Sequence, residues 1–554
     1  RREQGADVEE SGAAADPDFE PIAWCTSGGG IRAMATAIGF ANAFAKAGLF
    51  SSGQLTDVAS NSGGSWFLTQ FAFNGDFYSS VVGSSPEALQ DFVERLVLAY
   101  NDKLSFGEKA SNKLLQLVSK ALRVVGTFGT TLDESITLAE WVLGVGRTNW
   151  EEIVDTMLAS TPDLGSSSHY QDTAATEQSR TGLRGPTLHF QTSEVTTAYH
   201  DHRFLDVHVG FENVFMFDGE GRALSVDQGE DGSRTDMPVI PVQYVVRGSE
   251  GHDSQLSEGF QAPESTVYRY HVAEVGRTED PDTLVRSVSL ASDASHVQPA
   301  PQMPRQMPVS VVASASSAAV GMFASPLMLS EMVRNTVGDV AWEGCGFLCG
   351  DVGIRDLAPG PFNDFGICSR AAVSADQCPY PSRRFIDGGF VDNVATAQTV
   401  GLMQKKFGGR KTLRLILSLS SQNPMTLGKP DFSGLADLMQ HKDVKPGQVY
   451  KGQMYYNVAS QQVFDTVWDN LSWNDLSSEF QGDNGLKWAS ASGMTVDNPA
   501  FGVTAGTPVS LLLFAFNSNL ANMDDGYSQE YAAISSSIAG SSVHSVLEGW
   551  MQSQ

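Results

Sequence analysis

The stretch "VASNSGGSWFLTQF", residues 58–71, places a serine between small residues with apolar sequence on both sides. The residues before it favour a strand and those after it have a helical pattern, so Ser62 stands at an expected strand-to-helix turn. The frame Ser60 to Gly64 is similar to the G-x-S-x-G turn that exposes a nucleophilic serine, with Ser60 in place of the first glycine. Taken alone, an ordinary Gly/Ser loop explains these residues better, so the rest of the chain must supply a site.

A second element is "TSGGGIRAM", residues 26–34, which lies between the strand-like "PIAWCT" and a segment with helical apolar spacing. Consecutive glycines at such a position leave N–H groups aimed at one point near the positive end of a helix, which suits an oxyanion or a phosphate. Arg32, one turn into the helix, could hold an anionic head group. No G-K-[ST] follows, so a P-loop is excluded. A plain tight turn explains the glycines equally well.

The third element is "RRFIDGGFVDN", residues 383–393. Its apolar lead-in places Asp387 at the end of an expected strand, where a carboxylate could act as a general base. An ordinary Asp-Gly turn is the alternative.

The three elements together, in this order, resemble the patatin and cytosolic phospholipase superfamily. "GGGIRAM" is similar to the cytosolic phospholipase version and "DGGFVDN" to the patatin version, where Asn393 matches the second Asn of the usual pair and Asp392 departs from the first. "ASASSAAVGMFASP", residues 313–326, resembles the Ser-Ala-Ala helix start that lines these sites. The resemblance covers about 20–75 and 307–420.

The resemblance implies an α/β fold, a patatin-like three-layer sandwich with a mainly parallel central sheet. The expected organisation is an acidic N-terminal arm over 1–20 and a catalytic domain over 21–554, with core motifs in 21–75 and 307–420. Residues 85–306 are expected to form a helical and loop-rich insertion, and 421–554 a C-terminal extension.

The resemblance also implies a lipid acyl hydrolase, similar to phospholipase A or a lysophospholipase, acting through an acyl-serine intermediate on a glycerolipid or phospholipid. Ser62 would be the nucleophile and Asp387 its base, with Gly28, Gly29 and Gly30 as the oxyanion hole and Arg32 as the substrate-phosphate contact. No metal or other cofactor is expected. Two alternatives stay open: a Ser-Asp-His triad completed by His441 or His544, and an inactive fold that serves as a binding or assembly subunit.

The net charge of −28 and the pI of about 4.6 argue against a polyanion binder, so no nucleic acid partner is expected. The sequence contains no run of about twenty strongly apolar residues, so we expect no transmembrane segment. Peripheral membrane contact is left open, since a basic helical face is expected within 108–125. Four cysteines cluster within 345–378, as two disulfides or as free thiols, so secreted and cytoplasmic locations are equally compatible.

Two further patterns invite metal interpretations. His200 and His202 in "YHDHRF" lie on one side of an expected strand, without an obvious further ligand. The acidic "DQGEDGSRTD", residues 227–236, lacks the final Glu of a calcium loop. Both are interpreted as solvated segments.

Overall fold

The fold is described from a computed structural model of the chain. It describes residues 19–104, 150–161, 170–195, 239–249, 253, 255–261, 269–272, 288–291, 307–317, 363–365, 383–390, 392–408, 411–422, 463–465, 467, 472–480, 484–498, 501–518 and 527–553. The segments that contain His200 and His202 and residues 227–236, the expected basic face, the clustered cysteines and His441 lie outside these residues.

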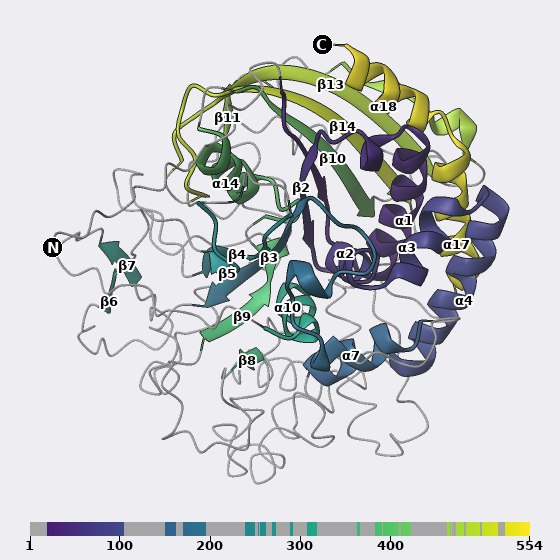
Figure 1. The fold of residues 1–554 in the computed structure, drawn as a ribbon, viewed down its shortest axis with the longest axis horizontal. Helices are drawn as coiled ribbons and strands as arrows, with labels where there is room; N and C mark the ends of the chain where they lie inside the picture. The colour runs from purple at the N-terminus through teal and green to yellow at the C-terminus, as the bar shows by residue number, and fades with distance from the viewer. Residues whose placement is uncertain are drawn as a thin grey trace, which may run out of the picture.

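A twelve-stranded sheet forms the centre of the molecule, and its five middle strands run parallel in the order β14-β10-β1-β2-β3 (Figure 1). Antiparallel strands extend it on both sides, with β13, β11 and β12 beyond β14 and with β4, β5, β9 and β8 beyond β3. The strand bounds are β1 Ile22–Thr26, β2 Leu55–Asn61, β3 Thr187–Val195, β4 Val239–Val246, β5 Gly259–Gln261, β8 Asn363–Phe365, β9 Arg383–Asp387, β10 Leu413–Gln422, β11 Phe464–Asp465, β12 Asn474–Asp475, β13 Gly485–Thr495 and β14 Pro508–Ser518. A separate pair joins β6 Arg269–Val272 to β7 Val288–Ala291.

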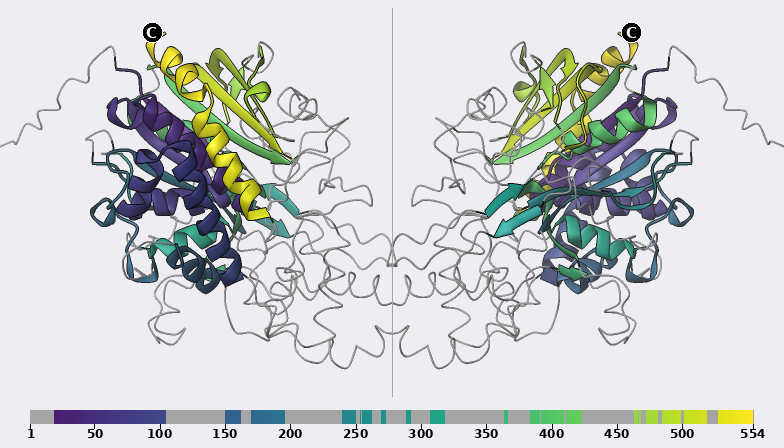
Figure 2. Two further views of the ribbon diagram at one scale, coloured as in Figure 1. Left: turned by 90° about the vertical axis from the view of Figure 1, so that its right-hand side faces the viewer. Right: turned by 90° about the vertical axis from the view of Figure 1, so that its left-hand side faces the viewer.

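The central strands are apolar on both sides because helices or loops cover both faces of the sheet. In β14, Leu512 and Phe514 pack into the larger core, whereas Leu511 and Leu513 face the smaller core on the opposite side. The larger core contains most of the helices, and Figures 1 and 2 show α17 lying alongside α1 and α4. Helix α14 covers the other face. The helix bounds are α1 Gly30–Lys46, α2 Gly63–Phe73, α3 Gly75–Gly83, α4 Pro86–Leu104, α7 Trp150–Ala159, α10 Val309–Ser316, α14 Ala397–Phe407, α17 Ser528–Gly540 and α18 Val543–Gln552.

Strand β3 changes its partner halfway along, and this change positions the site. Its first half pairs with β2, where Asn61 lies opposite Gln191. Its second half pairs, along the same edge, with β9. There Asp387 lies opposite Thr192, the residue of β3 that follows Gln191. The end of β2 and the end of β9 therefore meet at consecutive positions along one strand, although they lie more than 300 residues apart in the sequence.

The mixed α/β architecture with a parallel centre agrees with the expected fold class. The strands and helices predicted around residues 22–73 are confirmed. The region predicted as an insertion is different in its described part, because β3, β4 and β5 are strands of the central sheet. Likewise, the expected C-terminal extension contributes β14 beside β10. Among the described helices, none has both the length and the apolar character needed to cross a membrane.

Candidate active site

Ser62 lies at the sharp turn between β2 and α2, as the sequence predicted. Its φ of 48° is in the region that side-chain-bearing residues rarely adopt. The two residues that follow leave no space for side chains: a Cβ on Gly63 would clash with the carbonyl of Gly30, and one on Gly64 would lie 2.8 Å from the carbonyl oxygen of Ser27. The serine turn and the glycine-rich turn thus pack directly against each other.

Hydroxyl groups behind the turn explain why Ser60 can replace the usual glycine. Ser316 of α10 donates to the carbonyl of Gln191 at 2.5 Å, so its single hydrogen is committed. Ser65 must therefore donate to Ser316 at 2.7 Å, and Ser60 to Ser65 at 2.9 Å.

The same Ser316 hydroxyl accepts the backbone N–H of Ser62 at 3.2 Å. The segment predicted as a small-residue helix start contacts the turn directly, but its described part, residues 313–317, forms the C-terminal end of α10 and not the start of a helix. The chain of serines connects β2, α2, α10 and β3 behind Ser62.

Asp387 ends β9 beside this turn and is 2 % exposed. Its Oδ1 accepts the N–H of Gly389 at 2.7 Å and the amide of Asn61 at 3.1 Å, and the side chain of Ser62 lies close enough to act on the pKa of the carboxyl group. Burial raises the pKa of Asp387 to about 6, although Ser62, Gly389 and Asn61 all act to lower it. The structure thus places the two predicted residues Ser62 and Asp387 beside each other.

Asn61, the residue before the serine, was not singled out from the sequence. Its side-chain N–H groups reach Asp387 and the Oδ1 of Asn393, each at 3.1 Å. Asn393, which had been noted as a motif match, also accepts the N–H of Gly28 at 2.9 Å through its backbone carbonyl. An amide directly before a candidate nucleophile was the only available signal.

The glycine turn divides into two parts. The N–H of Gly28 is engaged by Asn393, so its predicted function as an oxyanion donor does not fit this geometry. Gly29 and Gly30 have φ values of 130° and 59°, which favour glycine, and their N–H groups have no acceptor within the described part of the chain. Gly29 directly precedes α1 and Gly30 begins it, and the N-terminal end of a helix favours negative charge.

Arg32 is 4 % exposed, and its Nε donates to the hydroxyl of Ser420 in β10 at 3.2 Å. This hydrogen bond anchors the first turn of α1 to the sheet. A contact between Arg32 and a substrate phosphate stays a prediction.

Asp392, the departure from the expected Asn pair, is fully buried. Its two oxygens accept the N–H groups of Val394 at 3.1 Å and Ala397 at 2.7 Å, so the carboxylate holds the loop that leads into α14. Burial raises the pKa of Asp392 to about 6 against these backbone hydrogen bonds. This donor-rich loop explains an acceptor-only side chain at the position.

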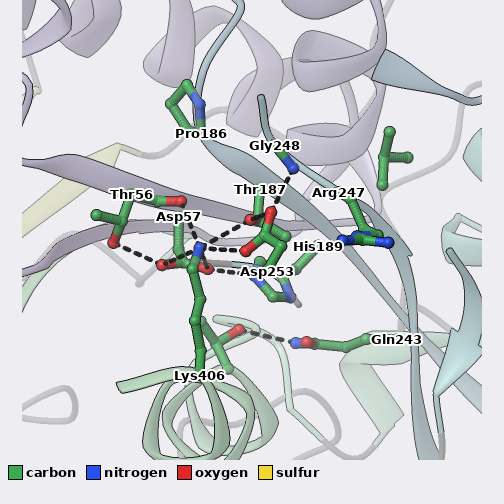
Figure 3. Close-up of polar contacts among 12 residues, drawn as sticks. Thr56, Asp57, Pro186, Thr187, His189, Gln243, Arg247, Gly248, Asp253 and Lys406 are labelled. Carbon is green, nitrogen blue, oxygen red and sulfur yellow. Dashed lines mark hydrogen bonds and ion pairs between the residues drawn. The ribbon is translucent and has the colours of Figure 1, made fainter. Parts of the chain in front are cut away.

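A second buried polar cluster lies at the opposite end of β2 and β3 (Figure 3). Asp57 is 2.8 Å from Nε2 of His189 and 3.4 Å from Nζ of Lys406, which reaches in from α14. Lys406 also pairs with Asp253 at 2.6 Å and donates to Thr187 at 2.8 Å. Burial acts to raise the pKa of Asp57, but Lys406 and the hydrogen bonds from His189 and Thr56 outweigh it and lower the pKa to about 2.

The alternative triad gains no support from the described residues. His544 lies in α18, where its Nδ1 is 3.0 Å from the carbonyl of Ser541. No described histidine is among the groups that shift the pKa of Asp387. In the described part of the chain no group of three or more His, Cys, Asp or Glu side chains is arranged to hold a metal ion.

Comparisons with known proteins add little to this geometry. No family model matches the chain, and no curated protein matches it by sequence. Among solved structures, human GIVD cytosolic phospholipase A2 is similar over 72 % of this chain and 45 % of its own length, with 12 % identity and a TM-score of 0.29. The chain thus spans less than half of that protein, and a likeness this weak assigns it neither a family nor an activity.

Proposed function

We propose that the protein is a serine acyl hydrolase in which Ser62 is the nucleophile and Asp387 the base. The observation that carries the proposal is the pairing of a serine in a strained turn with a buried carboxylate that has no cationic partner among the described residues. A serine hydroxyl needs an adjacent base because it is a weak nucleophile at its own pKa. A carboxylate with a pKa of about 6 accepts a proton more readily than an ordinary aspartate and is still ionised at neutral pH.

In the first half-reaction, Asp387 takes the proton of Ser62 while Oγ forms a bond to the ester carbonyl carbon. The negative charge that develops on the carbonyl oxygen is stabilised by the N–H groups of Gly29 and Gly30. When the intermediate collapses, the carbon–oxygen ester bond breaks and Asp387 returns the proton to the departing alcohol. Ser62 then carries the acyl group.

In the second half-reaction, Asp387 takes a proton from water as the water oxygen attacks the acyl-serine. Collapse releases the carboxylic acid, and the proton held by Asp387 returns to Oγ of Ser62. An alcohol in place of water would give acyl transfer through the same intermediate.

For the substrate we propose acyl esters of glycerolipids, most specifically phospholipids. This assignment rests on the resemblance of the three motifs to lipid acyl hydrolases and not on a described binding cavity. Arg32 would contact the phosphate in this proposal. Arg32→Ala should then lower the hydrolysis rate of phospholipids more than that of neutral glycerolipids.

The test is labelling of the full chain with a fluorophosphonate probe, followed by peptide mass spectrometry. The proposal requires the label on Ser62 and its loss in Ser62→Ala. A panel of phospholipids, lysophospholipids and neutral glycerolipids then identifies the substrate class. A well-folded protein that takes no label would instead support the binding or assembly subunit, and label on another serine would contradict the site assignment.

A further inference from the structure

The amide of Asn61 connects two parts of the site that lie far apart in the sequence. One hydrogen of its side-chain NH₂ group goes to Asp387 in β9, and the other goes to Asn393 in the loop before α14. Asn61 itself is fully buried at the end of β2, directly before Ser62.

The orientation of this amide is determined by its neighbours. An ionised carboxylate only accepts hydrogen bonds, so the NH₂ group and not the carbonyl of Asn61 must face Asp387. The side-chain oxygen of Asn61 then has no hydrogen-bond partner among the described residues. A buried acceptor without a partner is costly, which indicates that the contact on the NH₂ side is the one the fold maintains.

Two glycines make room for the bridge. A Cβ on Gly28 would lie 2.5 Å from Oδ1 of Asn393, 2.7 Å from Nδ2 of Asn61 and 2.9 Å from the Cβ of Ser62. A Cβ on Gly388 would clash with the side-chain oxygen of Asn61. The absence of side chains at these positions therefore serves the packing of Asn61.

The bridge also determines which oxygen of Asp387 is open. Asn61 and the N–H of Gly389 both donate to Oδ1. Because a carboxylate oxygen has two lone pairs, these two donors fill Oδ1 and leave Oδ2 to accept the proton of Ser62.

We propose that Asn61 is a positioning residue, which holds the Asp387 carboxylate with one oxygen toward Ser62 and, through Asn393, holds the glycine turn in register with it. This inference rests on the proposed function, because it assigns Asn61 to the reaction of Ser62 and Asp387. It also reassigns Gly28 from oxyanion donor to a position where only glycine leaves space for the bridge.

The test compares Asn61→Ala with Asn42→Ala across a pH series. Asn42 is a matched control, since it is also fully buried and donates two hydrogen bonds, to the carbonyls of Val81 and Ser84, but lies away from the site. The loss of a hydrogen bond to a charged group should lower the rate of Ser62 labelling in Asn61→Ala about ten- to hundredfold. The labelling rate should fall at low pH as Asp387 becomes protonated, and the pH midpoint of this fall should be higher in Asn61→Ala. The reason is that the hydrogen bond removed by the substitution favours the ionised form of Asp387. Asn42→Ala should lose stability with no change in this midpoint.

If Asn61→Ala does not fold, Asn393→Ala serves instead, because Asn393 is only half-buried and its loss removes the other anchor of the Asn61 amide. It should lower the labelling rate and move the midpoint in the same direction, by less. Wild-type labelling of Ser62 with an unchanged midpoint in both variants would overturn the positioning role while leaving the proposed function intact. Absence of wild-type labelling would overturn both.

Discussion

Two buried aspartates at opposite ends of the same part of the sheet have opposite electrostatic surroundings. Asp57, at the start of β2, faces Lys406 and His189, and its pKa is lowered to about 2. Asp387, beside the end of β2, has only neutral polar neighbours among the described residues, and its pKa is raised to about 6. Both are almost completely buried, so burial alone does not explain the difference.

The comparison shows how the partners of a buried carboxylate determine what it can do. A nearby ammonium stabilises the charged form so strongly that Asp57 is a poor proton acceptor at neutral pH. Neutral donors leave Asp387 ionised at neutral pH but able to take a proton. The first arrangement suits a structural clamp between β2, β3 and α14, and the second suits a base.

The largest effect on the labelling rate is expected from replacing Asp387, the proposed base. Asp387→Asn keeps the shape of the side chain but cannot accept a proton, so the labelling rate of Ser62 should fall about 10²- to 10⁴-fold. Asp57→Asn is the matched control, because it alters an aspartate that is also almost completely buried but lies near the start of β2, away from the serine turn. Its folded fraction should label at the wild-type rate, and an equal loss in both variants would contradict the comparison.

The next effect concerns the stability that the cluster around Asp57 contributes. Lys406→Met should lower the free energy of unfolding by about 3–5 kcal/mol, because it leaves Asp57 and Asp253 buried without their shared cation. Chemical denaturation measures this loss. Ser62 labelling in the folded protein should not change, and a mutant as stable as wild type would show that the cluster is not a clamp.

The two aspartates should also give opposite pH dependences of stability. The folded pKa of Asp387 is above its unfolded value, so its contribution to stability is complete below about pH 4 and is lost as the pH rises through about 6, on the order of 3 kcal/mol in total. The folded pKa of Asp57 is below its unfolded value, so its contribution is present above about pH 4 and is lost as the pH falls through about 2. Denaturation of Asp387→Asn and Asp57→Asn against wild type across this range measures both slopes, and slopes of the same sign would refute the assignment.

A smaller effect is expected behind the serine turn. Ser60→Gly restores the usual glycine but removes the hydroxyl that donates to Ser65, so the unfolding free energy should fall by about 1 kcal/mol. The labelling rate of Ser62 should stay within a few-fold of wild type. A large loss of labelling with intact stability would mean that the serine chain acts on the reaction itself.

Local sequence patterns predicted β1, α1, β2 and α2 because each is short-range: an apolar strand, a turn of small residues and a helix with regular apolar spacing. The contact between β9 and β3 was not predictable in this way, since it depends on the register at Thr192 and Gln191 in a region that resembled a loop-rich insertion.

The Asp57 cluster was also missed, although a charged residue inside the expected buried strand "LTDVAS" was a signal that a buried partner was required. Its partners lie some 130 to 350 residues away, and no spacing rule connects them.

The central claim is that Ser62 is activated by a neighbouring aspartate with a pKa near 6. The most direct test is the rate of fluorophosphonate labelling of Ser62 in the wild-type chain as a function of pH. If Asp387 is the base, the labelling rate rises with pH to a plateau, with a midpoint near pH 6 that disappears in Asp387→Asn. A labelling rate that does not fall at low pH, or a midpoint that persists in Asp387→Asn, would contradict the activation of Ser62 by Asp387.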